Sequence, residues 1–156
     1  MPLIGRGHST GNEARLGIDG FNLVNLFPCL TIERKIADMR TRYAGTRVTA
    51  TEPVFGLMFT ALGMVVRNMP FQMAVMNDTE PTAAEVAAFE DDLRGRKVRL
   101  LLYNSQATDA LATRMATLAR AARIPVVAVT ETEPPGVTYQ AWILRELEAV
   151  ERALAD

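Results

Sequence analysis

Apolar positions along the chain recur at spacings typical of alternating helices and strands. The first helix is predicted from four apolar residues spaced by four, three and four positions: Ile32, Ile36, Met39 and Tyr43. These residues fall on one helical face, and Gly45 can end the helix. The thirty residues before this pattern are rich in glycine and polar residues and show no sustained period. We expect residues 1–30 to be poorly ordered, with a short helix near Phe21 to Phe27.

The next stretch contains two candidate strands. Arg47–Thr51 is predicted as a strand, and an apolar helix follows from Pro53 to about Leu62, because proline suits the first turn of a helix. Val65-Val66-Arg67 is a second candidate strand. Phe71–Met76 is predicted as an extended apolar stretch that leads into the polar turn Asn77-Asp78-Thr79-Glu80-Pro81.

Beyond this turn, strands and helices are easier to separate. Thr82-Ala83-Ala84-Glu85 has the spacing of a capping box, in which the threonine and glutamate side chains bond to each other's backbone amides. It precedes a buried stripe made by Val86, Phe89 and Leu93. Val98–Tyr103 and Pro125–Thr130 are nearly continuous apolar runs, as expected of strands covered on both faces. The two remaining helices are marked by apolar stripes at Leu111, Met115, Leu118 and Ala122, and at Tyr139, Ile143, Leu147, Val150 and Leu154.

The order of these elements predicts an α/β fold. Strand and helix alternate, and the connections have the length of crossovers rather than hairpin turns. We therefore expect a mostly parallel sheet of about four strands with helices on both faces, a Rossmann-like single lobe.

Composition narrows the functional classes. The 156 residues are 49% hydrophobic and 22% charged, with a net charge of −1, so nothing favours a nucleic-acid partner. The lone Cys29 excludes an intrachain disulfide, and the lone His8 excludes a multi-histidine metal site within the chain. Charged residues interrupt the N-terminal segment, so we expect no signal peptide there.

Polar side chains that follow the predicted strands are the candidate functional residues. Glu52 follows the first strand, Asn104-Ser105-Gln106 a later one, and Glu131 and Glu133 the last. Ligands of open parallel sheets gather at the carboxyl ends of the strands, and paired carboxylates suit a divalent cation. The alternative is that these glutamates are solvated or cap the following helix, since Glu52 stands where a carboxylate favours a helix start.

Other conspicuous residues have simpler interpretations. Asp91 and Asp92 are interpreted as part of a solvated helix face, and Tyr139 and Trp142 as core residues. The methionines follow apolar elements and suggest gap filling in the core: Met58, Met64, Met69, Met73 and Met76. No phosphate-binding loop is visible, because Glu133-Pro134-Pro135-Gly136 lacks the lysine that such a loop needs.

Several segments, in order, resemble a known family. They are Thr49-Ala50-Thr51-Glu52-Pro53-Val54-Phe55-Gly56, Glu80-Pro81-Thr82, Leu102-Tyr103-Asn104-Ser105-Gln106, Pro125 to Gly136, and Thr138-Tyr139-Gln140-Ala141-Trp142. Across most of its length the chain resembles the C-terminal half of the zinc/manganese-type periplasmic solute-binding proteins of ABC importers.

This resemblance implies a metal site shared between two α/β lobes. The C-terminal lobe of such proteins supplies two ligands, which carry over to Glu52 and Glu131, with Glu133 as the second choice of register. It further implies Zn²⁺ or Mn²⁺ as cargo, an ABC permease as partner and a periplasmic location. Residues 31–156 then form the metal-binding lobe, and the histidine-bearing lobe has no counterpart here, as in a truncated form.

Two other functions stay open. A doubly wound enzyme domain that binds a nucleotide or small molecule would use the same strand ends, although no motif identifies an enzyme. A structural module would self-associate, because a lobe without its partner exposes apolar surface. We therefore also expect a homo-oligomer.

Overall fold

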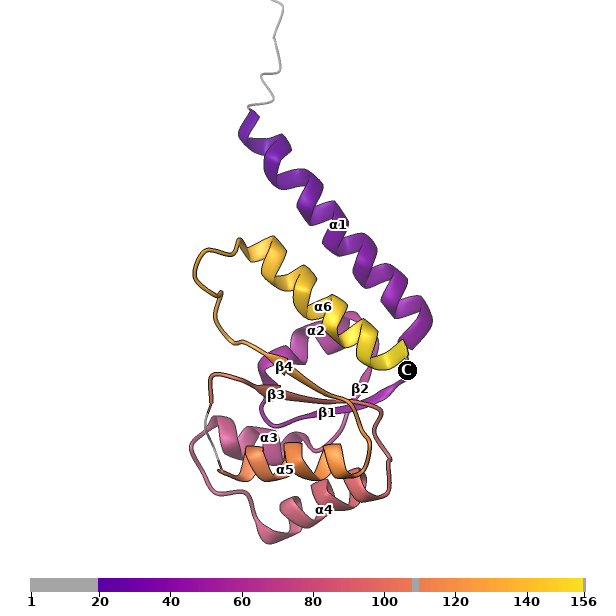
Figure 1. Ribbon diagram of the computed structural model, residues 1–156, viewed down its shortest axis with the longest axis vertical. Coiled ribbons are helices and arrows are strands. Elements are labelled where there is room, and N and C mark those ends of the chain that lie inside the picture. The colour runs from indigo at the N-terminus through magenta and orange to yellow at the C-terminus, as the bar shows by residue number, and fades with distance from the viewer. Residues whose placement is uncertain (1–19, 108–109, 156) are drawn as a thin grey trace, which may run out of the picture.

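The chain folds as a parallel sheet between two layers of helices (Figure 1). The computed structural model describes residues 20–107 and 110–155. The sheet contains β1 (Arg47–Ala50), β2 (Val65–Val66), β3 (Leu101–Asn104) and β4 (Val126–Val129). The helices are α1 (Gly20–Tyr43), the 3-10 turn η1 (Pro53–Phe55), α2 (Gly56–Ala61), α3 (Met69–Met76), α4 (Ala83–Arg94), α5 (Ala110–Ala121) and α6 (Tyr139–Ala155).

The strand order is β2-β1-β3-β4, and every pairing is parallel. The chain first moves outward from β1 to β2, then crosses back to β3 and continues to β4. The predicted α/β fold, with a four-stranded parallel sheet and helices on both faces, is confirmed.

Two apolar cores lie on opposite faces of the sheet. Helices α1, α2 and α6 cover one face (Figure 1). Met39, Phe59 and Leu147 are buried there. Helices α3, α4 and α5 cover the other face, where Phe71, Phe89 and Met115 are buried. Strand β3 contributes side chains to both cores, since Leu102 belongs to the first and Leu101 to the second. This alternation explains why its sequence is a continuous apolar run.

The predicted capping box at the start of α4 is present. Thr82 Oγ1 accepts a hydrogen bond of 3.3 Å from the backbone N–H of Glu85, and the Glu85 carboxylate accepts one of 2.8 Å from the N–H of Thr82. Two of the free amides at the helix start are thus satisfied.

The prediction of an extended stretch over Phe71–Met76 is wrong, because these residues belong to α3. Apolar residues there alternate with other types, which imitates the period of a strand. One local feature favours the helix instead, because Pro70 lies in its first turn. Asn68, just before the helix, has a left-handed backbone.

Other boundaries differ by a few residues. Helix α1 begins at Gly20 and so includes the short helix expected near Phe21 to Phe27. The rest of the segment expected to be poorly ordered, residues 1–19, lies outside the described residues, as does His8. Strand β3 begins at Leu101 rather than Val98. Among the described helices, none is long and apolar enough to cross a membrane.

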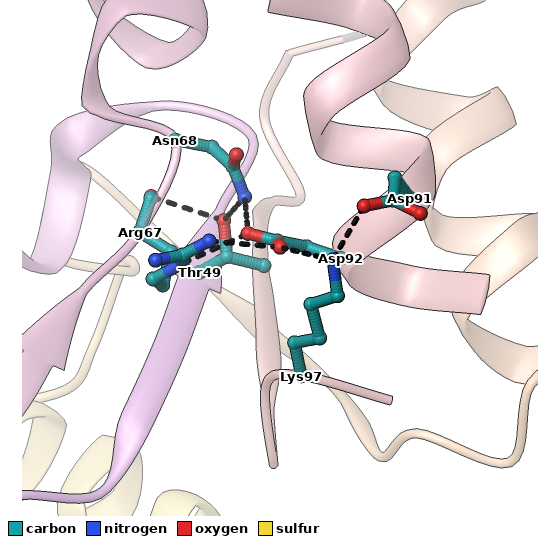
Figure 2. A network of polar contacts seen from close by, with 6 residues as sticks. All are labelled: Thr49, Arg67, Asn68, Asp91, Asp92 and Lys97. Carbon is teal, nitrogen blue, oxygen red and sulfur yellow. Dashed lines mark hydrogen bonds and ion pairs between the residues drawn. The ribbon is translucent and has the colours of Figure 1, made fainter. Parts of the chain in front are cut away.

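The interpretation of Asp92 as part of a solvated face is wrong. Its side chain is only 3% exposed, whereas that of Asp91 is 68% exposed. Figure 2 shows Asp92 reaching from α4 toward Arg67 and Asn68, which follow β2. The network ties the edge strand β2 to α4.

Candidate functional site

The candidate site lies where the direction of chain progression across the sheet reverses. Strands β1 and β3 are neighbours, but the chain leaves them toward opposite edges of the sheet. At such a reversal the loops that follow the two strands diverge and leave a crevice at their carboxyl ends. Glu52 follows β1, and Asn104 ends β3.

Glu52 is half-buried at this crevice. It occupies the N-cap position of η1 with an extended backbone, yet its side chain makes no capping bond. Instead, its Oε2 accepts a hydrogen bond of 3.4 Å from Asn104 Nδ2. The carboxylate therefore makes no capping hydrogen bond to the turn that follows and is available to the crevice.

Glu131 lies at the same carboxyl edge of the sheet, in the loop after β4. Gln106 holds this loop, because its Oε1 accepts hydrogen bonds from the backbone N–H of Glu131 at 2.8 Å and of Thr132 at 3.1 Å. Gln106 Nε2 also donates to Thr132 Oγ1 at 2.8 Å. The Glu131 side chain is exposed. The loop after β3 thus fixes the backbone of the residue that presents the second carboxylate.

Glu52 and Glu131 line one cleft of about 760 Å³. Asp78 and Glu80 line it as well, while Glu133 does not. Among the described residues, no lysine or arginine lines the cleft, and neither Glu52 nor Glu131 has a cationic partner. Four carboxylates without a facing cation make the cleft strongly attractive to positive ions.

Asp78 and Glu80 were not among the candidates from the sequence. They belong to the polar turn between α3 and α4, and that turn crosses the carboxyl edge of the sheet only because α3 is a helix. Asp78 has a left-handed backbone, φ 52°, directly after α3. An aspartate tolerates this conformation, so its presence in the turn also has a local structural reason.

A smaller hollow of about 260 Å³ adjoins the cleft and shares Glu131 with it. Glu146 lies in it and accepts hydrogen bonds from the backbone N–H of Thr130 at 2.9 Å and from Trp142 Nε1 at 2.8 Å. Tyr139 lines the same hollow but is 56% exposed, so the interpretation of Tyr139 as a core residue is wrong. Trp142 is half-buried and packs against the core.

The gap-filling interpretation also fails for three methionines of α3. Met69, Met73 and Met76 are at least one-third exposed, and Met76 reaches 50%. Leu57, which lines the smaller hollow, is 91% exposed. Of these exposed apolar side chains, Met76 lines the acidic cleft and Leu57 lines the smaller hollow beside it.

The described part of the chain holds no group of three or more histidine, cysteine, aspartate or glutamate side chains placed to bind a metal ion together. The arrangement presents separate carboxylates toward an open cleft. Its chemistry is that of a partial cation site, which needs further ligands from outside these residues.

A sequence profile of the family described as zinc-uptake complex component A, periplasmic, matches residues 30–153. The chain belongs to this family. The zinc-uptake family profile covers all four strands, and the predicted resemblance to metal-type solute-binding proteins is confirmed. No curated protein sequence matches the chain.

Solved structures similar to this family member agree on the fold. The periplasmic zinc binding protein TroA from Treponema pallidum has a TM-score of 0.58 and 15% identity, covering 83% of this chain and 48% of that one. FpvC from Pseudomonas aeruginosa, solved with Mn²⁺, has a TM-score of 0.60 and 11% identity, covering 85% and 49%. The laminin-binding adhesin Lmb from Streptococcus agalactiae has a TM-score of 0.59 and 12% identity, covering 80% and 46%. The chain thus spans about half the length of these proteins.

Proposed function

We propose that this chain is the metal-binding lobe of a solute-binding protein that delivers zinc or manganese to an ABC importer. Glu52 and Glu131 are the proposed ligands. The observation that carries this proposal is the acidic cleft at the carboxyl edge of the sheet. Both glutamates line it, and no lysine or arginine from the described part of the chain does. Membership of the zinc-uptake family supports a transported cation rather than a substrate of catalysis.

Two carboxylates provide only part of a coordination shell. Zinc usually takes four ligands and manganese more, so the remaining ligands must come from a surface that faces the cleft. TroA is described as zinc binding and FpvC was solved with Mn²⁺, and each is about twice as long as this chain. We propose that a second lobe closes over the edge formed by Glu52 and Glu131.

The positions of Glu131 and Glu133 support Glu131 as the second ligand. Glu131 lines the acidic cleft, whereas Glu133 lies two residues farther along the loop and is not part of the lining. The backbone of Glu131 is also held by Gln106, which orients the residue at little entropic cost. These contacts favour Glu131.

Location and partner are part of the same proposal. The family description places its members in the periplasm as components of a zinc-uptake complex. We infer that this chain acts there and passes its cation to the permease of such a complex. No motif for catalysis was found in the sequence, and the family gives no reason to propose one.

The test is titration of chelator-stripped protein with Zn²⁺ and Mn²⁺. Because half a site binds weakly, calorimetry should give a dissociation constant of about micromolar or weaker. Mn²⁺ is paramagnetic, so it should selectively broaden amide resonances of residues beside Glu52 and Glu131 even when binding is weak. The Glu52→Gln/Glu131→Gln variant should lose this broadening, and Glu133→Gln should retain it.

Two results would contradict the proposed site. Broadening centred away from the carboxyl ends of β1 and β4 would place the cation elsewhere. Broadening that disappears in Glu133→Gln but persists in Glu131→Gln would assign the second ligand to Glu133.

The exposed apolar residues of the smaller hollow support a structural function as the second candidate. Leu57 and Tyr139 are 91% and 56% exposed, and contiguous apolar surface favours association. We propose that the chain on its own forms a homo-oligomer through this edge. Light scattering should then give a mass above that of a monomer, and Leu57→Ser should lower it. A monomer at high concentration would contradict this second proposal without affecting the first.

A further inference from the structure

Four helices of the fold end in the same hydrogen-bonded turn. In each, the backbone N–H of one residue bonds to the carbonyl three residues back, and the N–H of the next residue bonds to the carbonyl five residues back. The first of these two residues has a left-handed backbone. That residue is Gly63 after α2 (φ 67°), Asp78 after α3 (φ 52°), Arg96 after α4 (φ 51°) and Arg123 after α5 (φ 59°).

The two arginines lack a conformational reason to be there. Glycine adopts a left-handed backbone without penalty and is usual at this position, and aspartate tolerates it through local hydrogen bonding. Arginine has neither property. Each of Arg96 and Arg123 therefore costs stability relative to glycine, and an outlier of this kind points to a function of the side chain.

Both side chains line one hollow at the amino ends of β3 and β4. The hollow has a volume of about 280 Å³, and its third cationic side chain is Arg99. Arg99 donates a hydrogen bond of 3.0 Å from Nη2 to the backbone carbonyl of Leu154, which fixes its guanidinium. The other lining residues are apolar: Val98, Ile124, Pro125 and Ala153.

The positive charge in this hollow is not neutralised by the described part of the chain. No aspartate or glutamate lines it, and neither Arg96 nor Arg123 forms an ion pair with a described residue. In contrast, nearby cationic side chains form ion pairs, because Lys97 pairs with Asp91 and Arg94 pairs with Glu90. The arginine hollow and the acidic cleft lie at opposite ends of the strands.

We propose that the arginine hollow binds an oxyanion of the phosphate class. Guanidinium groups match the oxygens of phosphate in a bidentate manner, and three of them favour a dianion over a monoanion. All three arginines are exposed, so an anion can reach them directly from solvent. The volume suits a single phosphate group, either free in solution or presented by a phospholipid headgroup, and is too small for a whole nucleotide.

The first test is calorimetric titration with inorganic phosphate at low ionic strength, together with thermal unfolding. Saturable binding with a dissociation constant of about 1 mM or tighter is expected, with a rise in Tm as phosphate is added. Arg96→Gly/Arg123→Gly should bind at least tenfold more weakly, about 1.4 kcal/mol. The same variant should have a higher Tm than the natural chain in phosphate-free buffer, because glycine relieves the left-handed backbone.

The combination of higher stability and weaker phosphate binding is what separates this proposal from a structural role, which would lower both. Arg145→Gln is the control, since Arg145 is an exposed arginine of α6 that does not line the hollow. It should leave phosphate binding unchanged. Equal phosphate affinity in the double glycine variant and the natural chain would overturn the proposal.

The second test distinguishes the two sources of phosphate. Phosphatidylcholine vesicles with and without phosphatidic acid are sedimented with the protein. Binding only to the vesicles that contain phosphatidic acid, lost in Arg96→Gly/Arg123→Gly, assigns the hollow to a headgroup. Binding of inorganic phosphate alone assigns it to a free anion. Failure of both probes would overturn the proposal.

Discussion

Arg67 donates hydrogen bonds of 2.9 Å from Nε and from Nη2 to the two carboxylate oxygens of Asp92 (Figure 2). Asn68 Nδ2 adds a bond of 3.2 Å to the same carboxylate and one of 3.3 Å to Thr49 Oγ1. Strand β2 has only two residues, so few ladder bonds hold it at the sheet edge. Side chains of β1, α4 and the β2–α3 connection therefore help to hold β2 in place.

Removing the acidic partner of this network should destabilise the fold. Asp92→Ala removes both carboxylate acceptors of the Arg67 guanidinium and one of the two acceptors of Asn68 Nδ2. It should lower the free energy of unfolding by about 2–3 kcal/mol. The loss is moderate because Arg67 is 43% exposed and water replaces part of the lost interaction. Urea denaturation measures the change. Asp91→Ala is the matched control, and its exposed pair with Lys97 should contribute less than about 0.5 kcal/mol.

The stability of the chain should fall in acid. Burial raises the pKa of Asp92, but hydrogen bonds from Arg67 and its charge more than offset this, so the pKa lies below its ordinary value. Hydrogen bonds from Lys35 and Arg42 likewise lower the pKa of Glu151. Both carboxylates then bind protons more readily in the unfolded state, and their stabilisation is complete above the ordinary pKa values of about 4.

As pH falls below that value, the stabilisation from both groups is lost progressively. Urea denaturation from neutral pH to about pH 3 should show a free energy of unfolding that declines at the acid end. Asp92→Asn should decline less over the same interval, because one of the two groups no longer titrates. A decline equally steep in Asp92→Asn and in the natural chain would remove Asp92 as a source of the pH dependence.

Substitutions in the two cores should lower the free energy of unfolding far more than substitutions on the exposed apolar surface. Phe59 is 1% exposed and packs edge-to-face on Phe55, with ring centroids 5.2 Å apart. Phe59→Ala should cost about 3–5 kcal/mol of unfolding free energy, through lost burial and the cavity that remains. Leu57, on the same helix, is 91% exposed, so Leu57→Ala should change stability by less than about 0.5 kcal/mol. A large loss for Leu57→Ala in dilute protein would mean that this side chain is buried in the monomer.

Much of the architecture could be predicted because local and global signals agree. The continuous apolar run that contains Leu101 and Leu102 indicated a strand covered on both faces, and parallel strands bring their carboxyl ends to one edge. That topology alone predicted that Glu52 and Glu131 lie at the same end of the sheet. Their common cleft follows from it.

What the sequence could not show depends on contacts between distant residues. Met69, Phe71, Met73 and Val75 alternate as they would in a strand, so the helix α3 was missed, and with it the path that carries Asp78 to the cleft. Asp92 looked like a surface residue because its partner, Arg67, lies 25 positions earlier. The exposure of Leu57 could not be predicted from the sequence either. An apolar residue can pack within its own lobe or against another one, and the sequence pattern is the same in both cases.

Gln106 offers a test of the cation site that leaves the proposed ligands unchanged. Its side-chain oxygen accepts the backbone N–H groups of Glu131 and Thr132, and its amide nitrogen donates to Thr132 Oγ1. Gln106→Ala should free the loop after β4 and weaken Zn²⁺ or Mn²⁺ binding about 10-fold, within the range for residues that orient a metal ligand. Because Gln106 is exposed, stability should change by less than about 1 kcal/mol. Calorimetric titration of the variant beside Gln140→Ala, a glutamine on α6 outside the cleft, measures the difference. Equal weakening by both variants would show that the loss is not specific to the Glu131 loop.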